Sequence, residues 1–249
     1  MSKTRIVFVH GSGRYGAAAW PTQHRLAGRY DCLFLKRTGF DAVVPPQPTD
    51  FAADEANVIE ALGAGGHVVA HAQGAIAAMM AAVARPDLVR SLVLVEPACL
   101  SLTAELPASA AYRGQLERLY ARRGQLTDAE FARELARVAP AGGFVDSSVS
   151  GSTGTGVFGG GVPESADRVA TRLRLQAPPW EAPLHIVPGV PTLVLTGGWE
   201  PLYEEIAGYL VTTGARHLVA PGGHRLHDLP EGAALIEEFI AADPGGGGL

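Results

Sequence analysis

The segment from His67 to Ala84 has the composition of a turn that presents a nucleophile, except that its central residue is alanine. An apolar stretch, HVVAH, runs into a short turn and then into an alanine-rich helix, and the small residues Ala70 and Gly74 flank Ala72 by two positions on each side. A nucleophile elbow needs small flanking residues because its strained turn brings strand and helix into close contact. The methyl group of Ala72 cannot attack a carbonyl. The segment therefore predicts the frame of covalent catalysis without its nucleophile.

A second motif, HGSG at residues 10–13, directly follows the first apolar stretch of the chain. Together with the elbow, it makes the chain resemble the α/β-hydrolase superfamily over nearly its whole length outside a central insertion. In that family the loop after the first strand supplies one backbone N–H of the oxyanion hole, and the residue after the nucleophile supplies the other. The resemblance therefore implies an oxyanion hole at Gly11 and Ser12 on one side and Gln73 on the other, with His10 bracing the loop.

A candidate general base follows the last apolar stretch, in PGGHRLH at residues 221–227. Gly-Gly-His at this place looks like the family's catalytic histidine, which takes the nucleophile's proton and passes it to the leaving group. The resemblance assigns this role to His224. His227 is the reserve candidate, for which we expect a surface or lid-facing position. His71, beside the elbow, is expected to be a packed structural residue.

The acid that orients His224 has two candidates. Glu200, in GGWEPLYEEI, takes the place of the aspartate in the family's usual Gly-x-x-Asp-Pro pattern, whereas Glu96 ends the apolar stretch after the elbow helix, where some members carry their acid. Either choice keeps the chain order nucleophile, acid, histidine. We expect the carboxylate that is not the acid to line the pocket or to lie at a helix N-terminus.

Ala72 has three interpretations. In the first, alanine deliberately replaces the serine of a hydrolase for esters, lactones or thioesters, and the chain binds with almost no turnover; the Gln-Gly that follows resembles the H-S-Q-G form and favours serine over aspartate as the lost residue. In the second, alanine is native, and His224 moves protons while the amides of Ser12 and Gln73 stabilise an enolate or alkoxide, as in a lyase, isomerase or cyclase. In the third, the frame is a ligand receptor without catalysis.

A different class of protein is suggested by Gly11 to Gly16, which satisfy G-x-G-x-x-G after an apolar stretch. Such a dinucleotide site needs an acidic residue at the end of the next strand, but DCLFLKR ends in Lys36 and Arg37, which suit only a phosphorylated cofactor. The motif also explains neither the elbow nor the Gly-Gly-His. We therefore expect no cofactor. We also expect no metal, because the only ligand-like histidine spacing, at the end of PGGHRLH, lacks a nearby carboxylate or cysteine set.

The elements between these motifs must bring them together. Apolar stretches without alternation predict strands buried on both faces of a parallel sheet, at 6–10, 32–36, 67–71, 92–96, 192–196 and 217–220. Helix-like segments separate or follow them, at 17–28, 52–62, 74–84, 201–213 and 231–242. The alternation predicts a three-layer α/β/α sandwich with a mostly parallel sheet and right-handed crossovers.

The alternation breaks between Glu96 and Pro191, where two amphipathic stretches, 110–122 and 127–138, precede the glycine-rich run 151–161. An insertion that leaves the carboxyl end of a strand lies over the ligand site of a parallel sheet, so this one predicts a cap or lid. The glycine-rich run is either a disordered surface loop or a lid hinge. The predicted boundaries are 1–97 and 184–244 for the core, 98–183 for the cap and 245–249 for a disordered tail.

The cap is expected to set substrate choice. Apolar residues at helical spacing predict the core of the lid: Leu116, Leu119, Tyr120, Phe131 and Leu135. Three aromatic residues are candidates for an apolar pocket: Phe158, Trp180 and Trp199.

Composition limits the partners of the protein. Its 249 residues are 47% hydrophobic and 18% charged, which is typical of one globular domain with an elaboration. A net charge of -5 gives no basic surface for nucleic acid, and no apolar run reaches the ~20 residues of a membrane span or forms a signal peptide. Cys32 and Cys99 are too few for a disulfide framework and favour a reducing compartment. We expect a cytoplasmic protein with a small apolar acyl substrate, and no oligomeric state is predicted.

Overall fold

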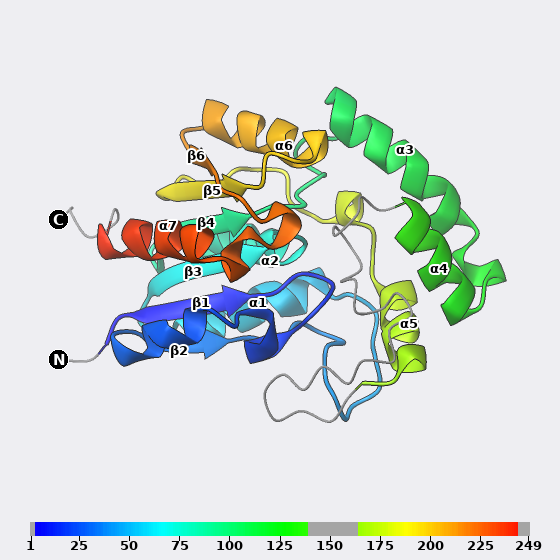
Figure 1. Cartoon of the computed structure of the whole chain (residues 1–249), viewed down its shortest axis with the longest axis horizontal. Coiled ribbons are helices and arrows are strands. Elements are labelled where there is room, and N and C mark those ends of the chain that lie inside the picture. The colour runs from blue at the N-terminus through cyan, green and yellow to red at the C-terminus, as the bar shows by residue number, and fades with distance from the viewer. Residues whose placement is uncertain (1–2, 139–163, 244–249) are drawn as a thin grey trace.

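The computed structural model describes residues 3–138 and 164–243, in which six parallel strands form one sheet in the order β2-β1-β3-β4-β5-β6. Helices cover both sides of the sheet, and a separate group of helices lies beyond one end of it (Figure 1). The strands are β1 (Arg5–Val9), β2 (Asp31–Phe34), β3 (Gly66–His71), β4 (Val89–Val95), β5 (Thr192–Thr196) and β6 (Arg216–Val219). Each one overlaps a strand expected from the sequence, so the predicted three-layer α/β/α sandwich is confirmed.

The sheet separates two apolar clusters because successive residues of a strand point to opposite faces. Val7 and Leu94 belong to the cluster on one face, and Phe8 and Val93 belong to the cluster on the other. The first face is covered by α1 (Phe51–Leu62), α2 (Gly74–Ala84) and α6 (Pro201–Thr212), and the second by α7 (Pro230–Ala241) and two short 3-10 helices. With both faces covered, the strands are apolar without alternation.

The segment expected to form a helix over 17–28 is instead two 3-10 helices, Gly16–Ala19 and Gln23–Gly28. Pro21 lies between them, and proline interrupts a helix because it lacks an N–H and its ring clashes with the carbonyl four residues earlier. Trp20, just before the proline, is fully buried in the second cluster. The segment therefore covers the sheet as predicted, but as two 3-10 helices in place of one α-helix.

The order of the strands reverses beside β1, which pairs with β2 on one side and with β3 on the other. Ligands of open parallel sheets bind at the carboxyl ends of strands next to such a reversal. The HGSG loop follows β1 and the elbow follows β3, and the ends of these two strands are in register at Val9 and Ala70. The topology therefore brings the two motifs together at the carboxyl ends of two neighbouring strands.

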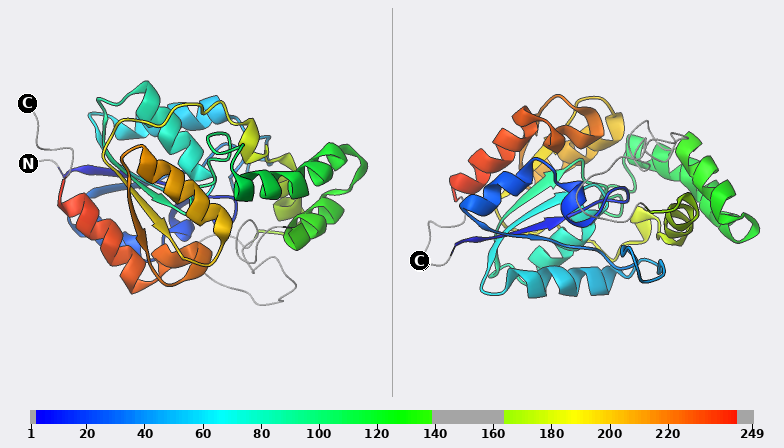
Figure 2. Two further views of the ribbon diagram at one scale, coloured as in Figure 1. Left: turned by 90° about the horizontal axis from the view of Figure 1, so that it is seen from above. Right: turned by 60° about the horizontal axis from the view of Figure 1, so that its bottom comes forward.

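Three α-helices in the described part of the chain form a group beyond the carboxyl ends of the strands, and both views in Figure 2 show this arrangement. They are α3 (Pro107–Ala121), α4 (Asp128–Val138) and α5 (Ala166–Leu175). The first two coincide with the amphipathic stretches predicted for the cap, and their apolar residues Leu116, Leu119, Phe131 and Leu135 are buried. The glycine-rich run 151–161, Phe158 and the tail 245–249 lie outside the described residues.

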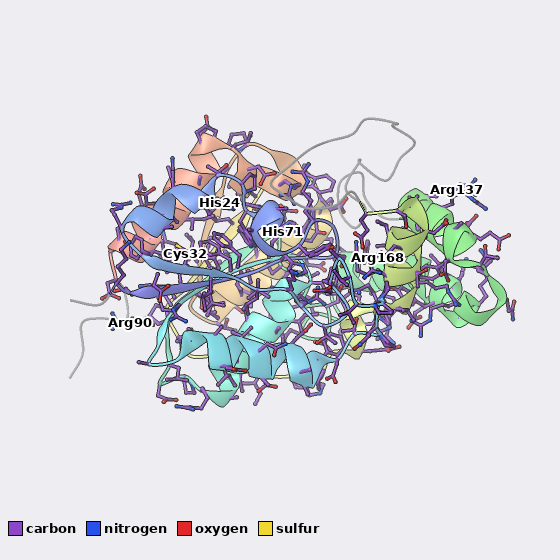
Figure 3. The ribbon with its side chains drawn as sticks, turned by 90° about the horizontal axis from the view of Figure 1, so that it is seen from below. His24, Cys32, His71, Arg90, Arg137 and Arg168 are labelled. Atoms are coloured by element: carbon purple, nitrogen blue, oxygen red, sulfur yellow. The ribbon has the colours of Figure 1, made fainter. Side chains whose placement is uncertain are left out.

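Helix α5 was not expected from the sequence. Its N-cap is Ser165, whose hydroxyl accepts a hydrogen bond from the Arg168 amide, and Asp167 lies in its first turn. A serine before an acidic first turn is a helix start signal. Arg168 also donates to the carbonyl of Asp41, so α5 is attached to the core loop after β2; Figure 3 places this arginine where the cap meets the core.

Within the part of the chain that the structure describes, none of the helices has the length and apolar character needed to cross a membrane.

Helix α2 begins so close to β1 that Gly74 has no room for a side chain. A Cβ on this residue would lie 2.4 Å from the carbonyl oxygen of His10 and 2.7 Å from that of Val9. We expect Gly74→Ala to lower the free energy of unfolding by about 1–3 kcal/mol, because backbone must move to admit the methyl group. Urea unfolding measures this change.

The matched control is Gly208→Ala in α6, where a Cβ would meet no heavy atom within 4 Å. Alanine is the better helix former, so this variant should gain about 0.5–1 kcal/mol. Equal stability of the two variants would contradict the close packing of α2 on β1.

Candidate active site

Strand β3 ends in a turn that holds Ala72 in the left-handed region, at a φ of 49°. A non-glycine residue there costs of order 1–3 kcal/mol, and surrounding contacts must impose it. The Ala72 amide donates to the carbonyl of Val95 at 2.9 Å, and its carbonyl accepts from the amides of Ala75 and Ala98, each at 3.1 Å. The conformation of a nucleophile elbow, predicted from the spacing of small residues, is therefore present, with the alanine 6% exposed.

The HGSG loop lies directly against this turn. A Cβ on Gly11 would be 3.0 Å from the Cβ of Ala72, which is tighter than ordinary van der Waals contact. The Ser12 hydroxyl donates to Oε1 of Gln73 at 2.7 Å. Among the described residues, neither the backbone amide of Ser12 nor that of Gln73 has a hydrogen-bond acceptor. The sequence suggests these two amides for an oxyanion hole. The segments that carry them are linked beside residue 72 by the Ser12–Gln73 side-chain hydrogen bond.

A buried polar network holds the loop in place. The carbonyl of Gly11 accepts from Nδ1 of His10 at 2.8 Å and from Nη1 of Arg37 at 3.2 Å. Because the carbonyl and the N–H of a planar trans peptide point in opposite directions, fixing this carbonyl also fixes the direction of the Ser12 N–H. Nε2 of His10 accepts from the Arg37 amide at 3.0 Å, and the guanidinium of Arg37 is paired with Asp54 at 3.0 Å. His10 therefore braces the loop, as expected.

The same network bears on the G-x-G-x-x-G alternative. Arg37, one of the two basic residues that would suit a phosphorylated dinucleotide, is buried and paired with Asp54. The element that begins at Gly16 is a four-residue 3-10 helix, whereas pyrophosphate binds at the N-terminus of an α-helix. The structure thus favours the hydrolase-like interpretation of this loop.

His224 lies in the connection between β6 and α7, after two glycines with positive φ, Gly222 at 120° and Gly223 at 56°. These values favour glycine and explain the Gly-Gly that precedes the histidine. Its ring centroid is 4.5 Å from that of His71, the residue before Ala72, and the histidine is 7% exposed. Nε2 of His71 donates to the carbonyl of His224 at 2.9 Å, so His71 ties the elbow to this loop, and Figure 3 places it inside the core.

Glu96 is the carboxylate beside His224. Its Oε2 lies 3.5 Å from Nδ1 of the imidazole, at the long limit of a hydrogen bond but within the range seen in acid–base pairs before substrate binds. The carboxylate is fully buried and also accepts from the Gly197 amide at 2.6 Å and from Nε1 of Trp199 at 3.2 Å. These donors stabilise a negative charge away from water.

Glu200 has a different position. It is the N-cap of α6, where its Oε1 accepts from the Leu202 amide at 3.4 Å. A helix N-terminus is one of the positions predicted for the carboxylate that does not orient His224. The sequence did not decide which of the two carboxylates orients His224. In the structure Glu96 lies beside His224, whereas Glu200 caps α6.

The expectation for His227 was wrong. Its side chain is fully buried, with ring centroids 4.6 Å from His71 and 4.7 Å from Trp20. Its backbone carbonyl accepts from Nε2 of Gln23 at 2.7 Å. The turn that carries His227 folds inward onto the 3-10 segment, and a short polar sequence gives little indication of that direction.

Two aromatic side chains of the β5–α6 region, Trp199 and Tyr203, lie near His224. The ring of Tyr203 is 5.2 Å from the imidazole and that of Trp199 is 6.4 Å from it, measured between centroids. Trp199 was a predicted pocket residue, whereas Tyr203 was missed, although its place one turn into α6 beside Trp199 is a usable signal. Trp180, another predicted pocket residue, packs in the cap against Tyr120, with ring centroids 5.6 Å apart.

Arg37 and Asp54 were also missed as parts of the site. The signal available was a basic residue just after the second strand and an acidic one in the first turn of the following helix.

No group of three or more potential ligand side chains in residues 3–138 and 164–243 is arranged to hold a metal ion.

Comparison with known proteins gives a family and a fold. A family model described as the Alpha/beta hydrolase family matches residues 6–237. Among solved structures, MenH from S. aureus is 15% identical with a TM-score of 0.66, over 98% of this chain and 95% of that chain. A carboxylesterase from the thaumarchaeon Nitrososphaera gargenis is 11% identical with a TM-score of 0.62, over 97% and 91%. The thioesterase domain of the curacin biosynthetic pathway is 20% identical with a TM-score of 0.56, over 96% and 91%. No curated protein sequence matches the chain.

Three buried histidines make stability depend on pH. Burial is the largest cause that holds the pKa of His10, His71 and His227 well below the usual value of 6.5. The positive charge of Arg37 lowers the pKa of His10 further, and that of Arg225 lowers the pKa of His71 and His227. These imidazoles stay neutral in the folded protein but protonate in the unfolded chain below about pH 6.5, so the unfolded state binds more protons there. We expect the free energy of unfolding to fall on acidification below about pH 6.5, by up to about 1.4 kcal/mol per pH unit for each histidine. Urea unfolding between pH 7.5 and 5.5 measures this slope.

His71→Gln keeps an N–H donor for the carbonyl of His224 and removes one of the three titrations. Its slope should be smaller by one histidine's share, about a quarter to a third, because burial also lowers the pKa of His67. His24→Gln, at an exposed position, should leave the slope unchanged. Equal slopes in all three proteins would show that His71 does not titrate in this way.

Proposed function

The chain belongs to the alpha/beta hydrolase family, and on that basis we propose that its site is built to cleave esters, lactones or thioesters of small apolar acyl compounds through a serine at position 72, a step that Ala72 removes. The observation that carries this proposal is the left-handed turn at residue 72 beside the His224–Glu96 pair. Such a turn costs free energy at any non-glycine residue and is useful where it presents a reactive side chain.

With a hydroxyl at position 72, each neighbouring group has a role. The hydroxyl attacks the substrate carbonyl while His224 takes its proton, and Glu96 holds the imidazole in orientation and stabilises its protonated form. The backbone amides of Ser12 and Gln73 receive the oxyanion. His224 then protonates the leaving group and activates the water that hydrolyses the acyl-enzyme. Tyr203 and Trp199 give the apolar surroundings of an acyl group.

The chain with Ala72 retains everything except the attacking oxygen. In the serine protease subtilisin, loss of the nucleophile lowers kcat by a factor on the order of 10^6. The protein should therefore bind its substrate and turn it over very slowly. The carboxylesterase and the thioesterase domain among the similar folds support the class of reaction at a coarse level.

A second function uses the same groups without a covalent intermediate. The His224–Glu96 pair is complete in a chain that carries alanine at the elbow, and this favours proton transfer by His224 next to a carbonyl whose developing charge rests on the Ser12 and Gln73 amides. A lyase, isomerase or cyclase has such a mechanism.

Ala72→Ser distinguishes the two functions. For hydrolysis we expect the variant to cleave p-nitrophenyl esters or acyl thioesters at least 10^4-fold faster than the Ala72 protein, with burst kinetics from the acyl-enzyme. Stopped-flow absorbance measures both the burst and the steady state, and His224→Gln in the Ala72→Ser background should abolish both.

A variant no faster than the Ala72 protein would refute the hydrolase proposal. His224-dependent conversion of a carbonyl compound by the Ala72 protein, without hydrolysis, would support the second function. Binding without conversion in both proteins would indicate a receptor.

The choice of acid is tested in the same Ala72→Ser background. Glu96→Gln should lower kcat/KM by roughly 10^4, because the amide favours the wrong imidazole tautomer. Glu200→Gln should change kcat/KM less than tenfold, since Glu200 caps α6, and it should lower the melting temperature slightly. The reverse order of the two effects would make Glu200 the acid.

A further inference from the structure

We propose that the side chain of Gln176 is a ligand-binding group of the candidate site and pairs with a carboxamide or lactam of the ligand. Gln176 follows α5 in the connection from the cap back to the core. It is 2% exposed, yet neither Oε1 nor Nε2 of its carboxamide has a hydrogen-bond partner among the described residues. Leaving buried polar atoms unpaired costs free energy, and native structures contain few of them.

The backbone around Gln176 is held on several sides. Its carbonyl accepts from Nη1 of Arg123 at 3.2 Å. The carbonyl of Leu175 accepts from the Thr49 amide at 3.4 Å, and the amide of Ala177 donates to the Thr49 hydroxyl at 3.0 Å. The carbonyl of Ala177 accepts from Nε2 of Gln73 at 2.9 Å. Cap helix, core loop and elbow therefore all fix this segment, while the carboxamide that it carries is left unpaired.

Gln73 is the matched comparison for Gln176. Both are buried glutamines, and their segments are hydrogen-bonded to each other. The Gln73 carboxamide is paired at both ends, accepting from the Ser12 hydroxyl and donating to the Ala177 carbonyl. Its role is structural. Gln176 precedes Ala177, whose carbonyl accepts the hydrogen bond from Gln73. The carboxamide of Gln176 makes no hydrogen bond among the described residues. A binding role therefore explains this side chain better than a structural one.

The chemistry of the ligand follows from the atoms left unpaired. A carboxamide offers an acceptor and a donor side by side, and both are satisfied at once by a partner with the same pair reversed. A primary carboxamide or a lactam has this arrangement at neutral pH. A carboxylate does not, because it can only accept and would leave Oε1 of Gln176 unpaired.

This inference rests on the proposed function in one respect, that the reacting carbonyl of the ligand lies at the amides of Ser12 and Gln73. The Ala177 carbonyl accepts from the Gln73 side chain, so the backbone segment that carries Gln176 lies beside the elbow. Gln176 would then select substrates that carry a carboxamide a short distance from the ester or thioester carbonyl.

Thermal unfolding of the Ala72 protein tests the inference without catalysis. Gln176→Leu removes two unpaired polar atoms at nearly constant volume, and we expect the melting temperature to rise by about 2–4 °C. Gln73→Leu, the matched control, breaks two hydrogen bonds and should lower it. A fall in melting temperature for Gln176→Leu would show that its carboxamide is a structural group and would overturn the inference.

Binding to the Ala72 protein tests it directly, with methyl succinamate and its apolar isostere methyl 4-methylpentanoate as probes in NMR titrations. The protein should bind the carboxamide about tenfold more tightly than the isostere, and Gln176→Leu should remove this preference. No preference in the unaltered protein, or an equal preference in Gln176→Leu, would overturn the inference. Failure of Ala72→Ser to hydrolyse esters would refute the proposed function but leave these two measurements to decide the role of Gln176.

Discussion

The main-chain hydrogen bonds around Ala72 are the constraint on which the site depends. Strand β4 supplies the acceptor for the Ala72 amide, and the segment that leaves β4 supplies one of the donors for its carbonyl. The absence of a side chain at Gly74 lets α2 begin against β1. The left-handed turn is therefore imposed by packing and backbone pairing, and it does not rely on the side chain of residue 72. This explains how the frame of a nucleophile persists around a methyl group.

The other components of the site reach this turn from separate strand ends. The loop after β1 is fixed by the buried Arg37–Asp54 pair and by His10, and the loop after β6 is tied to the elbow through the His71 hydrogen bond to the His224 carbonyl. Buried ion pairs and neutral buried histidines contribute little to net stability, because burying polar groups is costly. Their placement here is better explained by the orientation of backbone groups at the site.

Much of the fold was predictable because its physical signals are local. Strands covered on both faces must be apolar throughout, and a tight turn between strand and helix must have small flanking residues, so both are visible in the sequence. The choice between Glu96 and Glu200 was not predictable, because it depends on which carboxylate the sheet brings to His224. The inward direction of His227 and the 3-10 helices around Pro21 also depend on tertiary packing. Helix α5 lay in a segment whose neighbouring glycine-rich run obscured its serine cap.

The independence of the elbow from its own side chain has a genetic consequence. Alanine and serine codons can differ by a single base, and exchanging these residues at position 72 requires no rebuilding of the surrounding backbone. Under the proposed function, a point mutation within one lineage is enough to convert a protein that holds a ligand into one that consumes it, or the reverse, while the fold stays the same.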